Sequence, residues 1–148
     1  MFRRKGFTII ELLIVIAVIA ILVGIALPRF KGMRDEGNIA RAKGELRTLQ
    51  TAVESYMVHN NNTYPANLGV LTSATPSIVA NLPTDPFNGT ANYGYNTDGG
   101  APAQYYAIWS VGPAGGGSAS VSNTGAVTET NGASCIYVSN GTPADTQP

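Results

Sequence analysis

The feature that most restricts what this chain can fold into is an apolar run near its N-terminus, residues 7–27, which reads FTIIELLIVIAVIAILVGIAL. Eighteen of these 21 residues are apolar, and the exceptions are Thr8, Glu11 and Gly24. A helix of this length rises about 31 Å at roughly 1.5 Å per residue, which matches a bilayer hydrocarbon core of about 30 Å. The run therefore predicts a membrane-spanning helix.

A short basic leader, residues 1–6 (MFRRKG), precedes the apolar run. A secretory signal peptide has an apolar region of about 7–15 residues followed by a small-residue cleavage site, whereas this run is longer and continues into Pro28. Removal of the whole segment is therefore the weaker interpretation. Basic residues flank both ends of the run, but long C-terminal regions translocate largely regardless of charge. We expect the residues beyond Leu27 to lie outside the cytoplasm.

The charged residues are segregated along the chain. All nine Lys and Arg lie between Arg3 and Arg47, whereas residues 48–148 contain five acidic residues. Because the basic residues surround the apolar run, membrane contact explains them better than nucleic-acid binding, which we do not expect. The single cysteine, Cys135, and the single histidine, His59, cannot form an intrachain disulfide or a Cys/His metal cluster. With no plausible nucleophile and base, an enzyme is not expected.

The apolar run ends with Gly24 and Pro28, which are four residues apart. Pro28 lacks a backbone donor and clashes with the carbonyl of Gly24, so a kink or a melted turn is predicted there. Further along, apolar residues recur at alternating spacings of three and four, which indicates one stripe of a helix that packs on one side against a domain. The stripe comprises Ile39, Ala42, Leu46, Leu49, Val53 and Tyr56. Residues 60–62, three asparagines, predict the end of this helix.

After residue 62 the sequence changes to short strand candidates separated by Gly, Asn and Ser clusters. The candidates are residues 93–96, 104–111, 119–122, 126–129 and 134–139. We also expect a short helix near 68–71, a hairpin turn at 123–125, a frayed tail at 140–148 and a buried Cys135. The expected fold class is α+β, with a long N-terminal helix packed on a small antiparallel sheet.

Glu11 is the only ionisable residue of the apolar run. A charged group inside a membrane segment is costly and indicates a function by default. One interpretation is that Glu11 meets a cation of a neighbouring molecule. The other is that it extends to the cytoplasmic interface, because it lies only about 6 Å along the helix axis from Phe7. Its position leaves both interpretations open.

The sequence Gly6-Phe7-Thr8-x-x-Glu11, between a basic leader and an apolar helix, resembles the class III signal of type IV pilins and pseudopilins. The resemblance implies that a prepilin peptidase cuts between Gly6 and Phe7 and methylates the new Phe7 amine. It also implies that Glu11 pairs with the Phe7 amine of an adjacent subunit and sets the register of a helical filament. Pro28 matches the helix-interrupting proline of the family.

The C-terminal part resembles the major pseudopilin of type II secretion, the G-type subunit. The matching stretches are Thr63-Tyr64-Pro65, Leu82-Pro83-x-Asp85-Pro86-Phe87, Tyr93-x-Tyr95 and Tyr106-x-Ile108-x-Ser110-x-Gly112. In that family the region after the Ser-x-Gly run binds calcium through acidic and carbonyl ligands. Here it reads PAGGG at residues 113–117 and lacks the expected aspartate, which counts against calcium. We therefore expect no cofactor.

The resemblance implies a structural subunit of a filament that drives protein export by type II secretion. The alternative is a type IV pilin of a long surface fibre for adhesion, motility or DNA uptake, and a membrane-anchored domain without filaments is a third. The expected regions are a leader (1–6), a transmembrane and filament-core helix (7–27), an amphipathic outer half of the helix (28–62) and a globular domain (63–148). Expected partners are the chain itself, the membrane, a prepilin peptidase, an inner-membrane assembly platform and minor subunits. The chain would lie in the bacterial inner membrane before assembly, and in a periplasmic pseudopilus or a surface pilus afterwards.

Overall fold

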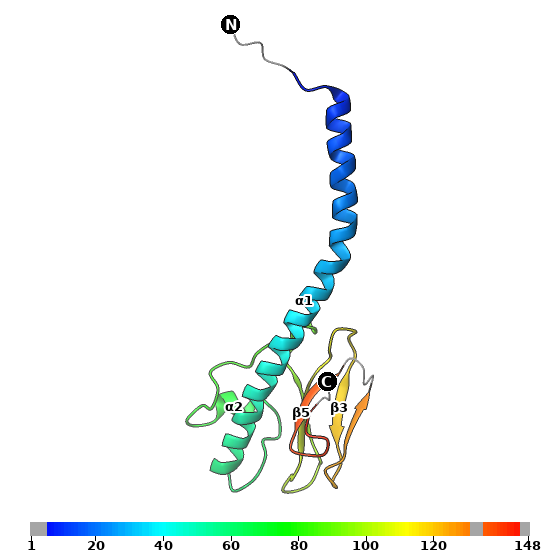
Figure 1. Cartoon of the computed structure of the whole chain (residues 1–148). Coiled ribbons are helices and arrows are strands. Elements are labelled where there is room, and N and C mark those ends of the chain that lie inside the picture. Colours follow the sequence, from blue (N-terminus) through cyan, green and yellow to red (C-terminus); the bar gives the residue numbers. More distant parts are fainter. Residues whose placement is uncertain (1–5, 131–134, 146–148) are drawn as a thin grey trace. The chain divides into compact units, whose positions relative to one another are not determined.

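The computed structural model describes residues 6–130 and 135–145 of the chain (Figure 1). Its elements in chain order are α1 (Ile9–His59), α2 (Val70–Ser73), β1 (Gly94–Thr97), β2 (Tyr106–Ser110), β3 (Ser118–Val121), β4 (Val127–Thr130) and β5 (Ile136–Ser139). The chain divides into two compact units, residues 1–36 and residues 37–148, and α1 contributes to both. The α+β class expected from the sequence is confirmed.

The first unit consists of the N-terminal part of α1. Its large apolar side chains are open to the surroundings, with exposed fractions from 47% at Val23 to 84% at Ile9. By length and composition α1 is able to cross a membrane. The helix continues without a break through Gly24 and Pro28, so the melted turn that the sequence allowed there is absent. The kink stays a prediction.

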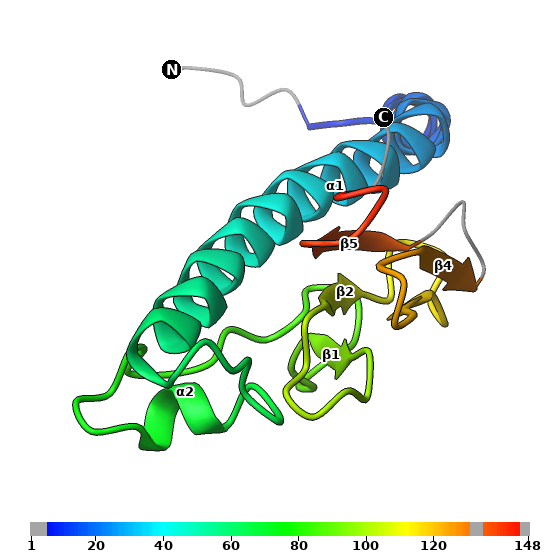
Figure 2. The same ribbon diagram turned by 90° about the horizontal axis from the view of Figure 1, so that it is seen from below.

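In the second unit, the apolar stripe of α1 packs against one face of a three-stranded antiparallel sheet with the strand order β1-β2-β5 (Figure 2). The stripe residues Ala42, Leu46, Leu49 and Val53 are at most 1% exposed, and Ile39 and Tyr56 are partly buried at its two ends. The amphipathic pattern thus predicted the buried face of α1 correctly. The helix ends at His59, directly before the three asparagines.

Strand β2 lies in the centre of the sheet and separates two hydrophobic clusters. Because successive side chains of a strand point to opposite faces, Tyr106 and Ile108 join the cluster under α1, whereas Ala107 and Trp109 face the other cluster. That second cluster is covered by the two-stranded antiparallel sheet β3-β4. The sequence predicted all five strands with shifted ends, but it predicted one sheet where the structure has two. The first residue of the last predicted strand, Ser134, lies outside the described residues.

Three smaller predictions for the second unit agree with the structure. Gly125 closes the β3-β4 hairpin with a φ of +79°, a backbone conformation that glycine adopts at no steric cost, so the hairpin turn is confirmed. Cys135 is 2% exposed and packs in the second cluster, where burial first and the charge of Glu129 second raise the pKa of its thiol to about 12. The short helix expected near residues 68–71 forms as α2, two residues further along.

The frayed tail that the sequence predicted at 140–148 is wrong for residues 140–145. Three backbone hydrogen bonds attach Thr142 and Ala144 to Gly125, Val127 and Ser139, with N···O distances of 2.6–3.0 Å. Composition alone cannot reveal this pairing, because Gly125 and Val127, the partners of Thr142, lie 17 and 15 residues before it in the sequence. Residues 146–148 lie outside the described residues.

Two carboxylates of α1 accept hydrogen bonds from tyrosines of the sheet side. The hydroxyl of Tyr93 donates to Glu45 at 2.6 Å, and the hydroxyl of Tyr106 donates to Glu54 at 2.7 Å. Burial first, and then the hydrogen bond to the neighbouring carboxylate and its charge, raise the pKa of both phenols far above their ordinary value of about 10. Helix and sheet are therefore joined by polar contacts as well as by the apolar stripe.

These tyrosines predict a loss of stability in alkaline solution. Below about pH 10 both phenols are protonated in the folded and the unfolded chain, so their full contribution is present. As the pH rises further, the unfolded chain releases these protons first, and each such tyrosine lowers the free energy of unfolding by about 1.4 kcal/mol per pH unit. Urea unfolding between pH 8 and pH 12 measures the slope, and Tyr106→Phe should reduce it. A free energy of unfolding that stays unchanged up to pH 12 would contradict the raised pKa values of Tyr93 and Tyr106.

Candidate assembly surface

The start of α1 is fixed by reciprocal hydrogen bonds between Thr8 and Glu11. The backbone N–H and the hydroxyl of Thr8 both donate to Oε2 of Glu11 at 2.8 Å, and the N–H of Glu11 donates to the Thr8 hydroxyl at 3.3 Å. This arrangement is a capping box, in which the residue before the helix and the third helical residue satisfy each other's backbone donors. Sequence reasoning missed it, although the pattern Thr-x-x-Glu before an apolar run is its known signature.

The capping box changes what the carboxylate of Glu11 can do. An ionised side chain at membrane depth is costly unless its oxygens are hydrogen-bonded, and Thr8 supplies two donors to Oε2 from within the same chain. Within the described part of the chain, no hydrogen bond reaches the other oxygen, Oε1. Glu11 is thus oriented by its own helix and keeps an acceptor for a donor from outside. Pairing with a neighbour's amine and extension to the interface both stay predictions.

The predicted processing point, Gly6 and Phe7, lies in the non-helical segment directly before α1. Both residues are exposed, and the side chain of Phe7 is 81% accessible. A Cβ atom added to Gly6 would meet nothing within 4 Å, so the fold of this chain itself does not require glycine at this position. Any requirement for Gly6 therefore has to come from a molecule that acts on the chain. The roles of Gly6 and Phe7 in cleavage and methylation stay predictions.

The side chains that follow Glu11 make a continuous apolar surface around the helix. Exposed apolar patches larger than a few hundred Å² are rare on soluble monomers and mark contact with a membrane or another protein. Here every large apolar residue from Leu12 to Leu27 is at least 47% exposed. Since this surface has no polar side to turn toward water, it needs an apolar environment on all sides.

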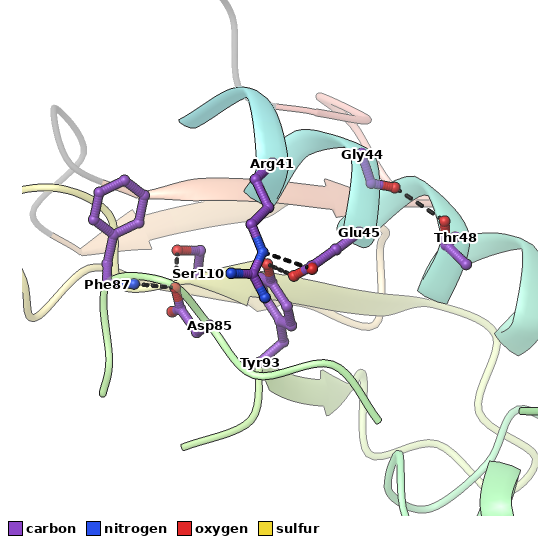
Figure 3. A network of polar contacts seen from close by, with 8 residues as sticks. All are labelled: Arg41, Gly44, Glu45, Thr48, Asp85, Phe87, Tyr93 and Ser110. Atoms are coloured by element: carbon purple, nitrogen blue, oxygen red, sulfur yellow. Dashed lines mark hydrogen bonds and ion pairs between the residues drawn. The ribbon is translucent and has the colours of Figure 1, made fainter. Parts of the chain in front are cut away.

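The second unit contains a buried aspartate, Asp85, that joins two distant segments (Figure 3). Its side chain is 1% exposed. Oδ1 accepts hydrogen bonds from the Ser110 hydroxyl at 2.8 Å and the Phe87 N–H at 2.9 Å, and Oδ2 accepts one from the Val111 N–H at 2.9 Å. The Ser110 oxygen in turn accepts from the N–H of Gly112 at 3.2 Å. One carboxylate thus fixes both the Leu82–Phe87 segment and the end of β2.

The helix reaches the same region through Glu45. Its carboxylate receives hydrogen bonds from Arg41 Nε at 2.8 Å, within the helix, and from the hydroxyl of Tyr93 at 2.6 Å (Figure 3). The Arg41–Glu45 pair is partly exposed, and such pairs contribute about 0–1 kcal/mol. The bond from Tyr93, which is 4% exposed, adds a buried polar contact to the apolar packing of α1 in this region.

The residues after β2 do not fit a calcium site. The loop at residues 112–117 contains no acid and closes on itself through backbone bonds from Gly115 to the Gly112 carbonyl at 2.9 Å and from Gly117 to the Val111 carbonyl at 3.1 Å. Calcium prefers six to eight oxygen ligands that include carboxylates. Among residues 6–130 and 135–145, no group of three His, Cys, Asp or Glu residues could hold a metal ion.

The acidic residues beyond Asp85 make contacts of their own. Asp98 accepts hydrogen bonds from the N–H groups of Gly100 and Gln104 at 3.1 and 3.2 Å. Burial first, and then the charge of Glu129, raise the pKa of Tyr137 to about 12. Asp98 therefore serves its own part of the fold rather than the 112–117 loop.

We expect calcium to leave the stability of the chain unchanged. The 112–117 loop is held by its own backbone bonds and by Asp85, so a divalent cation would add no strong contact. The thermal midpoint in detergent, followed by the emission of Trp109, should agree within about 1 °C between calcium and a calcium chelator, since a ligand that does not bind the folded state adds no stability. Magnesium serves as the matched control. A calcium-specific rise of several degrees would show that a site exists.

Comparisons with known proteins match the start of the chain most directly. The family model of the prokaryotic N-terminal methylation motif matches residues 1–27. The chain is 37% identical over 103 residues to fimbrial protein EcpB of Eikenella corrodens, which covers 66% of this chain and 65% of EcpB. It is 38% identical over 80 residues to the type IV major alpha-pilin of Moraxella bovis, covering 49% and 50% of the two chains.

A third relative carries the name of a secretion component. The chain is 28% identical over 65 residues to the type II secretion system core protein G of Pectobacterium carotovorum subsp. carotovorum, covering 44% of this chain and 41% of that protein. The matched stretches thus span between two fifths and two thirds of these three relatives. No solved structure matches the chain.

Proposed function

The chain belongs to the type IV pilin-like superfamily, and from this premise we propose that it is a structural subunit that polymerises through residues 7–27. In the proposed filament the apolar surface of α1 contacts the same surface of neighbouring copies. A side chain that is stable among lipid tails is equally stable among other apolar side chains. The segment thus serves first as a membrane anchor and then as the filament core.

We propose further that the filament is the short periplasmic pseudopilus of a type II secretion system. The observation that supports this choice is the hydrogen-bonded centre at Asp85. It brings the Leu82–Phe87 segment together with Ser110 and Gly112, and these are the stretches in which the sequence resembles the G-type pseudopilin. Two stretches that match in sequence therefore act as one structural unit, and the similarity to core protein G adds to this support.

The second candidate is a type IV pilin of a surface fibre, which two observations favour. Several of the similar proteins carry the names of fimbrial proteins or type IV pilins, and the 112–117 loop lacks the acid that the G-type resemblance implies. On either reading the proposed partners are a prepilin peptidase, an inner-membrane assembly platform and minor subunits. On either reading we propose a structural rather than an enzymatic role.

Deletion of the gene in its native host distinguishes the two candidate functions, a pseudopilus and a surface pilus. For a pseudopilus we expect proteins that are normally secreted to accumulate in the periplasm, while surface fibres remain visible by electron microscopy. For a pilus we expect the fibres to vanish while secretion continues. Complementation with the intact gene controls for effects on neighbouring genes. If both secretion and fibres are unaffected, the filament role itself is wrong.

The intact mass and the first residue of protein extracted from native membranes test the maturation step. The proposal expects a chain that begins at a methylated Phe7 and lacks residues 1–6. A chain that keeps Met1 and stays monomeric at every concentration would favour the third interpretation, a membrane-anchored domain without filaments.

A further inference from the structure

The segment after β5, residues 140–145, contacts four elements, namely α1, β2, β4 and β5. Thr142 forms a parallel bridge with Ala126, its N–H donates to the Gly125 carbonyl at 2.7 Å, and its carbonyl accepts from the Val127 N–H at 3.0 Å. Gly125 and Val127 belong to the turn and the second strand of the β3-β4 hairpin. This segment is therefore attached directly to the hairpin.

The same segment is also bound to the three-stranded sheet. The N–H of Ser139, the last residue of β5, donates to the Ala144 carbonyl at 2.6 Å, and Val138 forms an antiparallel bridge with Asp145. Asp145 Oδ2 further lies 3.6 Å from Nη2 of Arg47 on α1. Because both partners of this pair are largely exposed, the ion pair is weak, and the backbone bonds account for most of the attachment.

Asn140 fixes the start of the segment. Its Oδ1 accepts from the Tyr106 N–H at 2.8 Å, and its Nδ2 donates to the Gln104 carbonyl at 2.8 Å and to the Tyr64 hydroxyl at 3.1 Å. One side chain thus binds the segment before β2 and the beginning of β2. These bonds fix the position from which residues 141–145 run toward the hairpin.

Gly141 allows the segment to approach the hairpin closely. A Cβ atom at Gly141 would overlap the Gly125 carbonyl oxygen and lie 3.1 Å from Cγ2 of Val127. Glycine is required where one backbone passes this close to another. The sequence thus contains the residue that this contact needs, at the position where the contact forms.

We propose that residues 140–145 are a C-terminal clasp that fastens the β3-β4 hairpin to the three-stranded sheet. A two-stranded hairpin alone is at best marginally stable in water, and each strand of this one has four residues. The hairpin packs on the second hydrophobic cluster and accepts one side-chain hydrogen bond, from Asn96 to the Ala119 carbonyl at 3.3 Å. Across the part of the chain that the structure describes, the backbone–backbone hydrogen bonds that tie it to another segment are the two made by Thr142. The clasp does not depend on the kind of filament that the chain forms.

Hydrogen exchange of the full chain in detergent, read by mass spectrometry, tests the clasp. Truncation after Asn140 removes the contacts of Thr142 and Ala144, whereas truncation after Asp145 keeps them and serves as the control. The clasp predicts that peptides from residues 118–130 exchange at least about tenfold faster in the shorter chain, because local opening sets the rate of exchange. Peptides from residues 106–110 should keep their protection in both chains. Equal protection of the hairpin in both chains would overturn the proposal.

Two point variants give a result even if the shorter chain does not fold. Gly141→Ala places a Cβ against the Gly125 carbonyl and should open the hairpin, whereas Thr142→Ala keeps both backbone bonds and should exchange like the wild type. Faster exchange at 118–130 in Gly141→Ala alone supports the clasp. Equal exchange in the two variants, or an effect of Thr142→Ala alone, contradicts it.

Discussion

Replacement of Asp85 by alanine is expected to lower the free energy of unfolding of the globular unit by about 3–5 kcal/mol. The change leaves three donors without their acceptor, namely the hydroxyl of Ser110 and the N–H groups of Phe87 and Val111. Each donor left unsatisfied in the interior costs about 1–3 kcal/mol, and small domains are stable by only about 5–15 kcal/mol. A fall of this size should lower the thermal midpoint by about 10 °C or more.

The emission of Trp109 measures this loss, because the single tryptophan lies on β2 next to Ser110. Asp85→Asn keeps one acceptor oxygen and should fall between the wild type and Asp85→Ala. Ser110→Ala removes the hydroxyl that links Asp85 with the Gly112 N–H and should cost about 1–2 kcal/mol. If Asp85→Ala unfolds like the wild type, the carboxylate does not hold the two segments together.

The sequence predicted those parts of the fold in which residue spacing determines burial. The stripe from Ile39 to Tyr56 follows the helical period, so its buried face could be read directly. The strands could be predicted for a similar reason, because runs of β-branched and aromatic residues are separated by Gly- and Asn-rich turns. For these elements the spacing of neighbouring residues is sufficient to predict which side chains are buried, and the tertiary structure buries those side chains.

The hydrogen-bonded centres could not be predicted in the same way. Asp85 belongs to the Leu82-Pro83-x-Asp85-Pro86-Phe87 motif, but its partners Ser110 and Val111 are 25 and 26 residues away. Thr142 likewise pairs with Gly125 and Val127 only because the hairpin lies beside β5. Such contacts depend on the order of strands in space. A polar, Pro- and Gly-containing end therefore indicated a frayed tail where the structure has an attached one.

The capping box at the start of α1 is a different case, because its signal is local. Thr8 and Glu11 stand at the spacing of the motif, but the cost of a charge in the membrane suggested only contacts with other molecules or with the interface. The structure adds an internal role for Glu11. Internal capping uses Oε2 of the carboxylate, and the proposed contact with a neighbour would use Oε1, so an experiment can separate the two.

Glu11→Ala is expected to leave the chain in the membrane and to reduce filament assembly severely. Within a single chain the change removes only a capping box at the first turn of a long helix, so its cost there is small. In the filament it would remove the proposed partner of a neighbour's Phe7 amine. A charge left unpaired in an apolar environment is strongly unfavourable, so we expect subunit affinity to fall by roughly a hundredfold or more.

Thr8→Val separates the two roles, because it removes the hydroxyl contacts with Glu11 but keeps the carboxylate and the backbone N–H of residue 8. Membrane fractionation checks insertion of each variant, and sedimentation of sheared filaments measures assembly. We expect Thr8→Val to assemble at close to the wild-type level and Glu11→Ala to stay in the membrane fraction. An equal loss in both variants would assign the effect to capping of the helix. Normal assembly of Glu11→Ala would show that the carboxylate does not set the register between subunits.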